Sequence, residues 1–238
     1  PDSLTGTVSV QADFKEISGD ISIPASVANG EINYSVTLIP DKAFAKCSNL
    51  VSVIIPNSVT SIGSSAFSGC SGLTGIIISD SATYIGDNAF RGCSNLENIE
   101  IPDSVAEIGS WAFFGCTSLI NINVAPGNAH YSSQDGVLFS QEGTVLVQYP
   151  AKKEGEYALP EGVTSIGNYA FYNCTGLTSL ILPESMNVIG QNAFYKFEGL
   201  QQIYLPSTLE AIGEDLCQNN RRFGFLQMRK IEICLYPG

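Results

Sequence analysis

Apolar residues recur along this chain at a fixed interval. The dipeptide Ala-Phe stands at 43–44, 66–67, 89–90 and 112–113, each copy 23 residues after the last, and again at 170–171 and 193–194. A fixed period of this length is typical of a solenoid, in which each repeat forms one coil and packs on the coils before and after it. The pattern therefore predicts one elongated repeat domain.

A second apolar position, which usually precedes a proline, predicts the number of coils. It is occupied by Ile23, Ile55, Ile78, Ile101, Val124, Leu159, Leu182, Leu205 and Ile233. Most of these positions are 23 residues apart, and three longer intervals mark insertions. We therefore expect about nine coils.

Within one coil, the apolar spacing changes from that of a strand to that of a helix. Ile99 and Ile101 alternate with polar residues, which is the period of a strand with one buried face. Further on, Ile108, Ala112 and Cys116 are four residues apart, which predicts the buried stripe of a short helical segment. The predicted fold class is an α/β repeat solenoid with one parallel β-sheet face and short helical turns opposite.

A glycine precedes most of the predicted helical segments. Gly86 and Gly109, for example, stand before Asp87 and Ser110, which are residue types that cap helix N-termini. At these glycines, either a positive φ or a close contact between coils would exclude a Cβ atom.

The full repeat, I-P-x-S-V-x-x-I-G-x-x-A-F-x-x-C-x-x-L-x-x-I, is found from Ile55 to Ile76 and from Ile101 to Ile122. It resembles the BspA-like leucine-rich repeats of bacterial surface and secreted proteins, and the resemblance extends from about Ile21 to Ile233. It implies a right-handed superhelix and an exported parent protein. It also implies a role in adhesion, because the family is associated with binding to host matrix proteins.

The breaks in the period suggest how the domain is divided. We expect an N-terminal cap in residues 1–20 and a solenoid in residues 21–238, ending in a capping repeat at 206–238. Residues 125–160 interrupt the repeat with two strand-like runs between turn signals, which predicts a β-hairpin. This hairpin either protrudes to contact a ligand or widens one coil.

Charge and hydropathy narrow the choice of partners and location. The chain has 11 Lys and Arg against 23 Asp and Glu, a formal net charge of −12, which disfavours nucleic acid and anionic membranes. No run of 18 apolar residues is present, so direct membrane insertion is not expected. The chain starts at Pro1 without a signal segment. We interpret it as the mature or trimmed form of an exported protein, extracellular or at the cell surface.

The cysteines predict core packing rather than chemistry. Five of the seven share one position of the repeat, namely Cys47, Cys70, Cys93, Cys116 and Cys174. We expect them to form a ladder of free, inward-facing thiols that behave as small apolar groups. Cys217 and Cys234 lie off this ladder and form the one pair worth testing for a disulfide. The C-x₂-C spacing of zinc sites is missing, so no metal site is expected.

The sequence does not predict an enzyme. Its single histidine, His130, lies in a loop, and a Ser–His or Cys–His mechanism would have to use it. The acidic residues of the insertion do not single out a catalytic pair, and the glycines belong to the repeat rather than to a phosphate-binding loop. We therefore expect no catalytic residues and no cofactor.

The outward side chains of the predicted strands are the candidate binding surface. The candidate partner-binding residues are Ile54, Ile77, Asn98, Glu100, Asn121, Asn123, Ile181, Gln202 and Tyr204. Apolar residues at its two ends flank a polar centre, and exposed apolar clusters often mark interfaces, although isoleucine also favours strands for its own sake. We predict binding of a host or extracellular matrix protein. The alternatives are a glycan-binding module, through Tyr204 and the asparagines, and a structural spacer that presents another domain.

Overall fold

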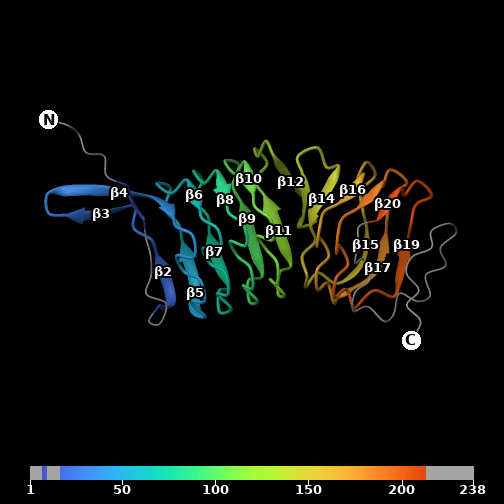
Figure 1. The fold of residues 1–238 in the computed structure, drawn as a ribbon, viewed down its shortest axis with the longest axis horizontal. Coiled ribbons are helices and arrows are strands. Elements are labelled where there is room, and N and C mark those ends of the chain that lie inside the picture. The colour runs from blue at the N-terminus through green and yellow to red at the C-terminus, as the bar shows by residue number, and fades with distance from the viewer. Residues whose placement is uncertain (1–6, 10–16, 213–238) are drawn as a thin grey trace.

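The computed structural model describes residues 7–9 and 17–212. These residues form an elongated β-solenoid of about seven coils, which follow one another along the long axis in chain order (Figure 1). The prediction of nine coils over the whole chain is not supported. Its eighth coil would begin near Leu205 and its ninth would contain Ile233, so both would fall mainly on residues 213–238, which lie outside the described residues.

One long side of the solenoid is made of short parallel strands, which we call the strand face. Its strands are β2 (Ser18–Ser22), β5 (Asn49–Ile54), β7 (Gly75–Ile77), β9 (Asn98–Ile101), β11 (Asn121–Val124), β15 (Gly155–Ala158), β17 (Leu177–Ile181) and β19 (Gln202–Tyr204). The pairing follows the repeat, so that Asn98 lies opposite Asn121 and Glu100 opposite Asn123. The strand face is not one sheet, however. It consists of β2-β5-β7, β9-β11 and β15-β17-β19.

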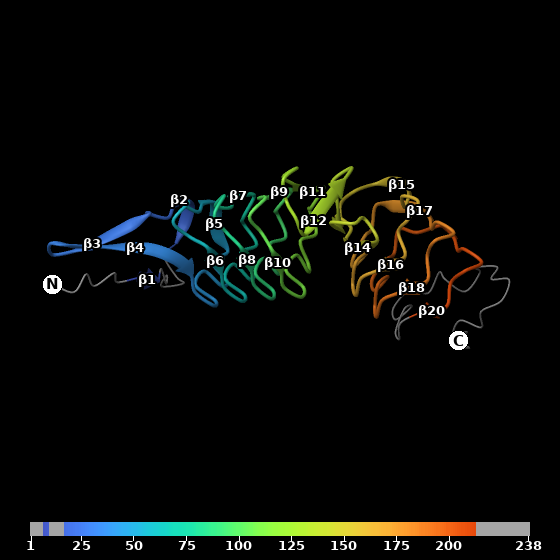
Figure 2. The same ribbon diagram turned by 90° about the horizontal axis from the view of Figure 1, so that it is seen from above.

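A second side carries a further row of parallel strands, most of them only two residues long, and the sequence pattern did not predict these two-residue strands. The row consists of β4 (Ile32–Ile39), β6 (Ser61–Ile62), β8 (Tyr84–Ile85), β10 (Glu107–Ile108), β14 (Val145–Gln148), β16 (Ser165–Ile166), β18 (Val188–Ile189) and β20 (Ala211–Ile212). Figure 2 shows the coils running between this side and the strand face. The inward isoleucines Ile62 and Ile85 are fully buried, so this side closes the core.

The third side consists of the Ala-Phe segments, and the helices predicted there were wrong. Within the described residues these segments are hydrogen-bonded turns. Backbone N–H groups alternate between two acceptors: Ala66 donates within its own turn to Gly63 O, whereas Phe67 donates to Ala89 O of the next coil, at 2.8 Å. Because every second donor is used between coils, the i to i−4 ladder of an α-helix cannot form.

Left-handed backbone also interrupts these segments. The residue before Ala and the second residue after Phe both have positive φ, as at Asn88 (56°) and Gly92 (74°). A left-handed residue ends a helix rather than continuing it. The predicted N-cap residues act between coils instead, since Asp87 Oδ1 accepts from the backbone N–H of Ser110 at 2.7 Å.

The core is a stack of rings and thiols inside the coil. Phe44, Phe67, Phe90 and Phe113 stack nearly parallel, with centroids 5.1, 5.6 and 5.9 Å apart. A second stack begins at Tyr149, whose ring lies 5.0 Å from that of Phe171. The core therefore consists of two clusters, which meet at the insertion.

The insertion widens one coil. Strands β12 (Tyr131–Gln134) and β13 (Val137–Ser140) form an antiparallel pair, and β13 pairs with β14 in the same way, within the range where the sequence predicts a hairpin. Val137, Leu138 and Phe139 are buried, so these strands are part of the wall of the solenoid. Their contribution to the core favours the widened coil over the protruding arm.

A hairpin does protrude from the first coil. Strand β3 (Ser26–Asn29) pairs antiparallel with the start of β4, and the two extend beyond the body of the solenoid (Figures 1 and 2). Strand β1 (Thr7–Ser9) pairs in parallel with β4. The cap boundaries 1–20 and 206–238 stay predictions, and most of the second range lies outside the described residues.

Candidate interaction surface

The nine candidate residues all lie on strands of the strand face, in two separate patches. The first patch consists of Ile54, Ile77, Asn98, Glu100, Asn121 and Asn123, on β5 to β11. The second patch consists of Ile181, Gln202 and Tyr204, on β17 and β19. The insertion follows β11 and a new sheet starts at β15, so the structure does not bring the two patches together.

The apolar members of both patches are uncovered in the described part of the chain. Ile77 is 62% exposed and Ile54 46%, and they lie opposite each other in the pairing of β5 with β7. Ile181 and Tyr204 lie opposite each other on β17 and β19, with 43% and 48% exposed. Adjacent exposed apolar side chains of this size are typical of interaction surfaces.

The polar centre of the first patch is tied together by its own side chains. Asn121 Nδ2 donates to Asn98 Oδ1 at 2.8 Å, and Asn123 Nδ2 donates to Glu100 Oε1 at 2.7 Å. These bonds fix the orientation of the amides and of the carboxylate. They also occupy part of the hydrogen-bonding capacity that a glycan would need from the asparagines.

A hollow of about 370 Å³ opens between the apolar and polar parts of the first patch, and we call it the Gly75 hollow. It is lined by Ser52 and Ile54 of β5, Gly75 and Ile77 of β7, and Asn98 and Glu100 of β9. Strands β7 and β9 are neighbours but belong to different sheets, so the strand face opens at this point. The volume is at the small end of the range for binding sites.

Charges are segregated on the molecule. Strands β2, β5, β7, β9 and β11 contain the carboxylates of Asp20 and Glu100 and no Lys or Arg. Four of the described cations lie instead in the Ala-Phe turns, namely Lys42, Lys46, Arg91 and Lys196. The first half of the strand face is therefore acidic.

The sequence reasoning missed a cluster of aromatic side chains on the Ala-Phe side, which we call the aromatic cluster: Trp111, Phe114, Tyr169, Tyr172 and Tyr195. Phe114 stacks on Tyr172 with centroids 3.8 Å apart, and Trp111 meets Tyr169 edge-on at 5.9 Å. Tyr172 in turn stacks on Tyr195 at 5.9 Å.

The aromatic cluster joins the coils on either side of the insertion. The widened coil has no Ala-Phe turn, so the turns around Ala112 and Ala170 meet directly through these rings. The sequence contained a signal for this contact. Trp111 and Tyr169 occupy the left-handed position before Ala, where the other coils have Lys, Ser or Asn, and a bulky residue with positive φ is unusual.

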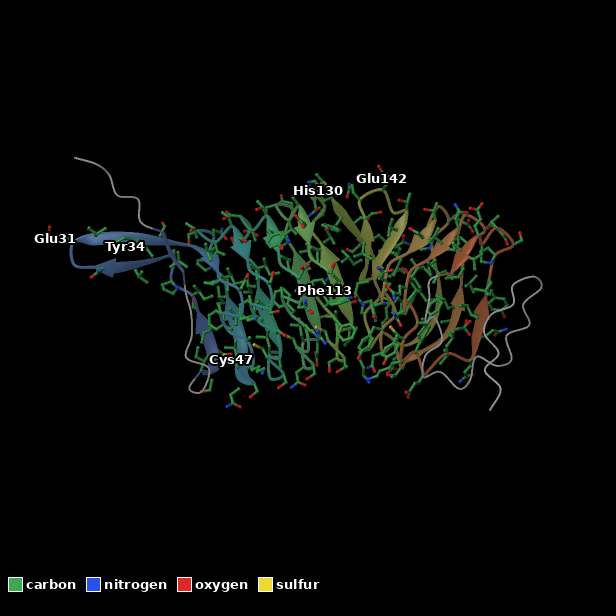
Figure 3. The ribbon with its side chains drawn as sticks, viewed as in Figure 1. Glu31, Tyr34, Cys47, Phe113, His130 and Glu142 are labelled. Carbon is green, nitrogen blue, oxygen red and sulfur yellow. The ribbon has the colours of Figure 1, made fainter. Side chains whose placement is uncertain are left out.

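His130 lies in an exposed loop of the insertion. Its backbone N–H donates to Asn128 Oδ1 at 2.8 Å. Figure 3 shows it at the edge of the molecule, near Glu142 and away from the core position of Phe113. Over residues 7–9 and 17–212, no three His, Cys, Asp or Glu side chains are grouped as metal ligands would be.

The cysteine ladder is buried and its five thiols are free, as predicted. The thiols of Cys70, Cys93 and Cys116 each donate to a carbonyl of the coil before, as Cys93 Sγ does to Phe67 O at 3.2 Å. Burial raises the pKa of Cys70 and of Cys116 to about 12. Phe197 takes the same position in a later coil and is fully buried, which fits core packing. Cys217 and Cys234 lie outside the described residues.

These thiols are expected to resist alkylation while the chain is folded. At about pH 8 the thiolate is the reactive form, and burial raises the pKa of Cys70 far above that pH. Iodoacetamide should therefore leave the five ladder cysteines unmodified in buffer and modify all of them in urea, as measured by peptide mass spectrometry. Rapid native labelling of Cys93 would contradict the buried ladder.

The same shifts predict how stability depends on pH. A thiol whose pKa is higher in the folded than in the unfolded state stabilises the folded chain fully below the ordinary pKa of 9.0. That contribution is lost as pH rises from about 9 toward about 12, because the unfolded chain ionises first.

The fold and the strand face define a leucine-rich-repeat solenoid. The family described as BspA type Leucine rich repeat region matches residues 24–136 and 153–231 in six copies. The chain therefore belongs to the BspA-type leucine-rich-repeat family, as the resemblance in the sequence implied. No curated protein matches the chain significantly.

Solved bacterial structures share the fold. The pneumococcal vaccine antigen PcpA is similar with a TM-score of 0.66 and 26% identity, over 85% of this chain and 64% of that chain. A leucine-rich cell surface protein of Faecalibacterium prausnitzii has a TM-score of 0.53 and 27% identity, over 80% of this chain and 70% of that one. A leucine-rich repeat protein of Eubacterium ventriosum, 24% identical, has a TM-score of 0.63 over 82% of this chain and 55% of that chain.

The family narrows the function to a general class. BspA-type repeats are typical of bacterial surface proteins, and leucine-rich-repeat proteins generally mediate protein–protein interactions. Their fold is typically non-enzymatic. In the described part of the chain, no helix has the length and apolar character needed to cross a membrane.

Proposed function

We propose that this chain is a non-catalytic interaction module of an exported bacterial surface protein, which binds a host or extracellular matrix protein through the strand face. One observation carries the proposal. Ile54 and Ile77 form an adjacent apolar pair on β5 and β7, at 46% and 62% exposure, in a position where the repeat accepts polar residues. Burying such a pair against a partner is favourable.

We place the proposed contact with the partner on the first patch, because apolar side chains, a hollow and a hydrogen-bonded carboxylate lie together there. The second patch is a separate surface beyond the insertion. Extracellular or cell-surface location belongs to the same proposal, and it is supported by the surface proteins that the chain resembles.

A glycan-binding module has less support from the geometry. Its candidate residues do not form one site, because Tyr204 is on β19 whereas Asn98 and Asn121 are on β9 and β11. A pure spacer would leave Ile54 and Ile77 without a partner.

Capture on immobilised matrix proteins and mucins separates these functions. The wild-type chain is expected to bind a matrix protein, and Ile54→Glu/Ile77→Glu is expected to lose that binding, because two carboxylates would be buried in an apolar contact. The control is Ile181→Glu, which adds a carboxylate at a similarly exposed isoleucine on the second patch.

Other outcomes would change the proposal. Binding to mucin glycans that is lost in Tyr204→Ala and kept in Ile54→Glu/Ile77→Glu would replace it with the glycan module. If the folded wild-type chain binds neither the matrix proteins nor the mucins, the structural spacer is the function that remains. Circular dichroism of each variant checks that the fold is retained.

A further inference from the structure

We propose that the Gly75 hollow receives an arginine or lysine side chain from an extended basic segment of the partner. The inference rests on the proposed function, since it specifies the chemistry of a partner bound at the first patch. Four features of the hollow lead to it: its walls, its charged rim, its floor and the charge of the surrounding face.

The walls suit an aliphatic stem. Ile54 and Ile77 lie opposite each other in the pairing of β5 with β7, and both line the hollow. Arginine and lysine carry three or four methylene groups before their charge and commonly lay these along apolar surfaces. A partner stem in this position would cover the exposed isoleucine pair.

The rim supplies the opposite charge. Glu100 borders the hollow on β9, and its Oε1 accepts from Asn123 Nδ2 at 2.7 Å, which holds the carboxylate in place. In the described part of the chain, the one ion pair is Lys152 with Glu154, 3.6 Å apart, so no described cation neutralises Glu100. A guanidinium or ammonium group at the rim would form a charge-assisted hydrogen bond with this carboxylate.

The floor is kept open by Gly75. It occupies the column in which the neighbouring strands carry Ser52 and Asn98, and a Cβ atom at Gly75 would have no heavy atom within 4 Å. Its φ is not in the left-handed region, so the backbone does not require glycine there. Glycine at this position leaves the space that a partner side chain would fill.

The charge of the surrounding face selects a cation over an anion. Strands β2, β5, β7, β9 and β11 carry Asp20 and Glu100 and no Lys or Arg, and the whole chain has a net charge of −12. An acidic segment would be repelled, and a purely apolar side chain would bring Glu100 to the edge of an apolar contact without a counter-ion.

Fluorescence anisotropy with two labelled peptides tests the inference. The probe has the sequence G-S-V-R-V-R-S-G, and its match, G-S-V-E-V-E-S-G, reverses the charge. We expect the arginine peptide to bind the wild-type chain with a Kd of about 0.1 mM or below and the glutamate peptide not to bind. Affinity for the arginine peptide should fall as salt rises.

Two variants of the chain test the location. Gly75→Leu places a side chain in the hollow, where its Cβ atom would meet no heavy atom within 4 Å, and it is expected to weaken binding at least tenfold. Glu100→Gln is expected to weaken it about threefold to tenfold and to reduce its salt dependence. Gln202→Leu is the matched control, because it places leucine at the equivalent position of β19 on the second patch, and it should leave the affinity unchanged.

Three results would overturn the inference: equal binding of the two peptides, full affinity in Gly75→Leu, or no binding of the arginine peptide at about 1 mM. The outcome is separable from that of the proposed function. Suppose that Ile54→Glu/Ile77→Glu loses binding to a matrix protein, whereas Gly75→Leu and Glu100→Gln both retain it. The proposal of a basic side chain in the hollow is then wrong, and the proposed contact at the strand face is still supported.

Discussion

Phe67→Ala is expected to lower the free energy of unfolding by about 3–5 kcal/mol, because it removes a ring from the middle of the phenylalanine stack. Phe67 is completely buried, and its ring lies 5.1 Å from that of Phe44 and 5.6 Å from that of Phe90. Neighbouring coils are held at a fixed spacing by backbone hydrogen bonds, such as Phe67 N–H to Ala89 O, so they cannot collapse into the space.

Urea denaturation followed by circular dichroism measures this effect. The control is Ile77→Ala, which also shortens an apolar side chain but at a position that is 62% exposed, and it should change stability by less than about 0.5 kcal/mol. A loss below about 1 kcal/mol in Phe67→Ala would mean that the ring is not part of a closely packed stack.

Gly86→Ala is expected to destabilise the chain by about 3 kcal/mol, at the upper end of the cost of overpacking. A Cβ atom at Gly86 would lie 2.6 Å from the backbone nitrogen of Ser64 and 2.7 Å from the carbonyl carbon of Gly63. The atoms in the way are backbone rather than flexible side chain, so the coils would have to separate. Of the two reasons the sequence gives for this glycine, close contact between coils is therefore the correct one.

Gly75→Ala is the matched control for this substitution, because the same added methyl group would meet nothing within 4 Å. It is expected to leave the unfolding free energy unchanged or to raise it by up to about 1 kcal/mol, since glycine is the less favourable residue in a strand. Urea midpoints of the two variants measure the difference. Equal destabilisation by both would contradict the close approach at Gly86.

The apolar period was sufficient to predict the solenoid, because every inward position is repeated in several coils. The alternation around Ile99 predicts the strand face, and the shared position of Cys93 and Cys116 predicts the buried ladder. These features depend on which side chains are buried, and a repeated pattern of apolar residues predicts that directly.

The Ala-Phe turn shows where the pattern is ambiguous. Ile108, Ala112 and Cys116 have helical spacing and do point toward the core, but the backbone between them contains left-handed residues at Trp111 and Gly115. A buried stripe specifies which residues face inward, and it does not specify whether N–H groups donate within the coil or between coils. That choice depends on the neighbouring coil, which local spacing does not contain.

The sequence predicts which side chains of the strand face point outward, but it does not predict where the strand face is interrupted. The outward direction of Ile54, Ile77 and Tyr204 follows from the strand period. The openings in the strand face, between β7 and β9 and between β11 and β15, depend on which strands share a ladder. The aromatic cluster was missed for a related reason, since Trp111 and Tyr169 are 58 positions apart (169 − 111) and meet only because the widened coil lacks an Ala-Phe turn.

The most direct test of the strand-face contact is the ratio of two affinities, measured by biolayer interferometry on the matrix protein that the wild-type chain captures. We expect Ile54→Glu/Ile77→Glu to bind at least about 100-fold more weakly than the wild type, and Ile181→Glu to bind as the wild type does. An affinity of the double variant within about threefold of the wild-type value, with its fold intact, would contradict a contact at these isoleucines.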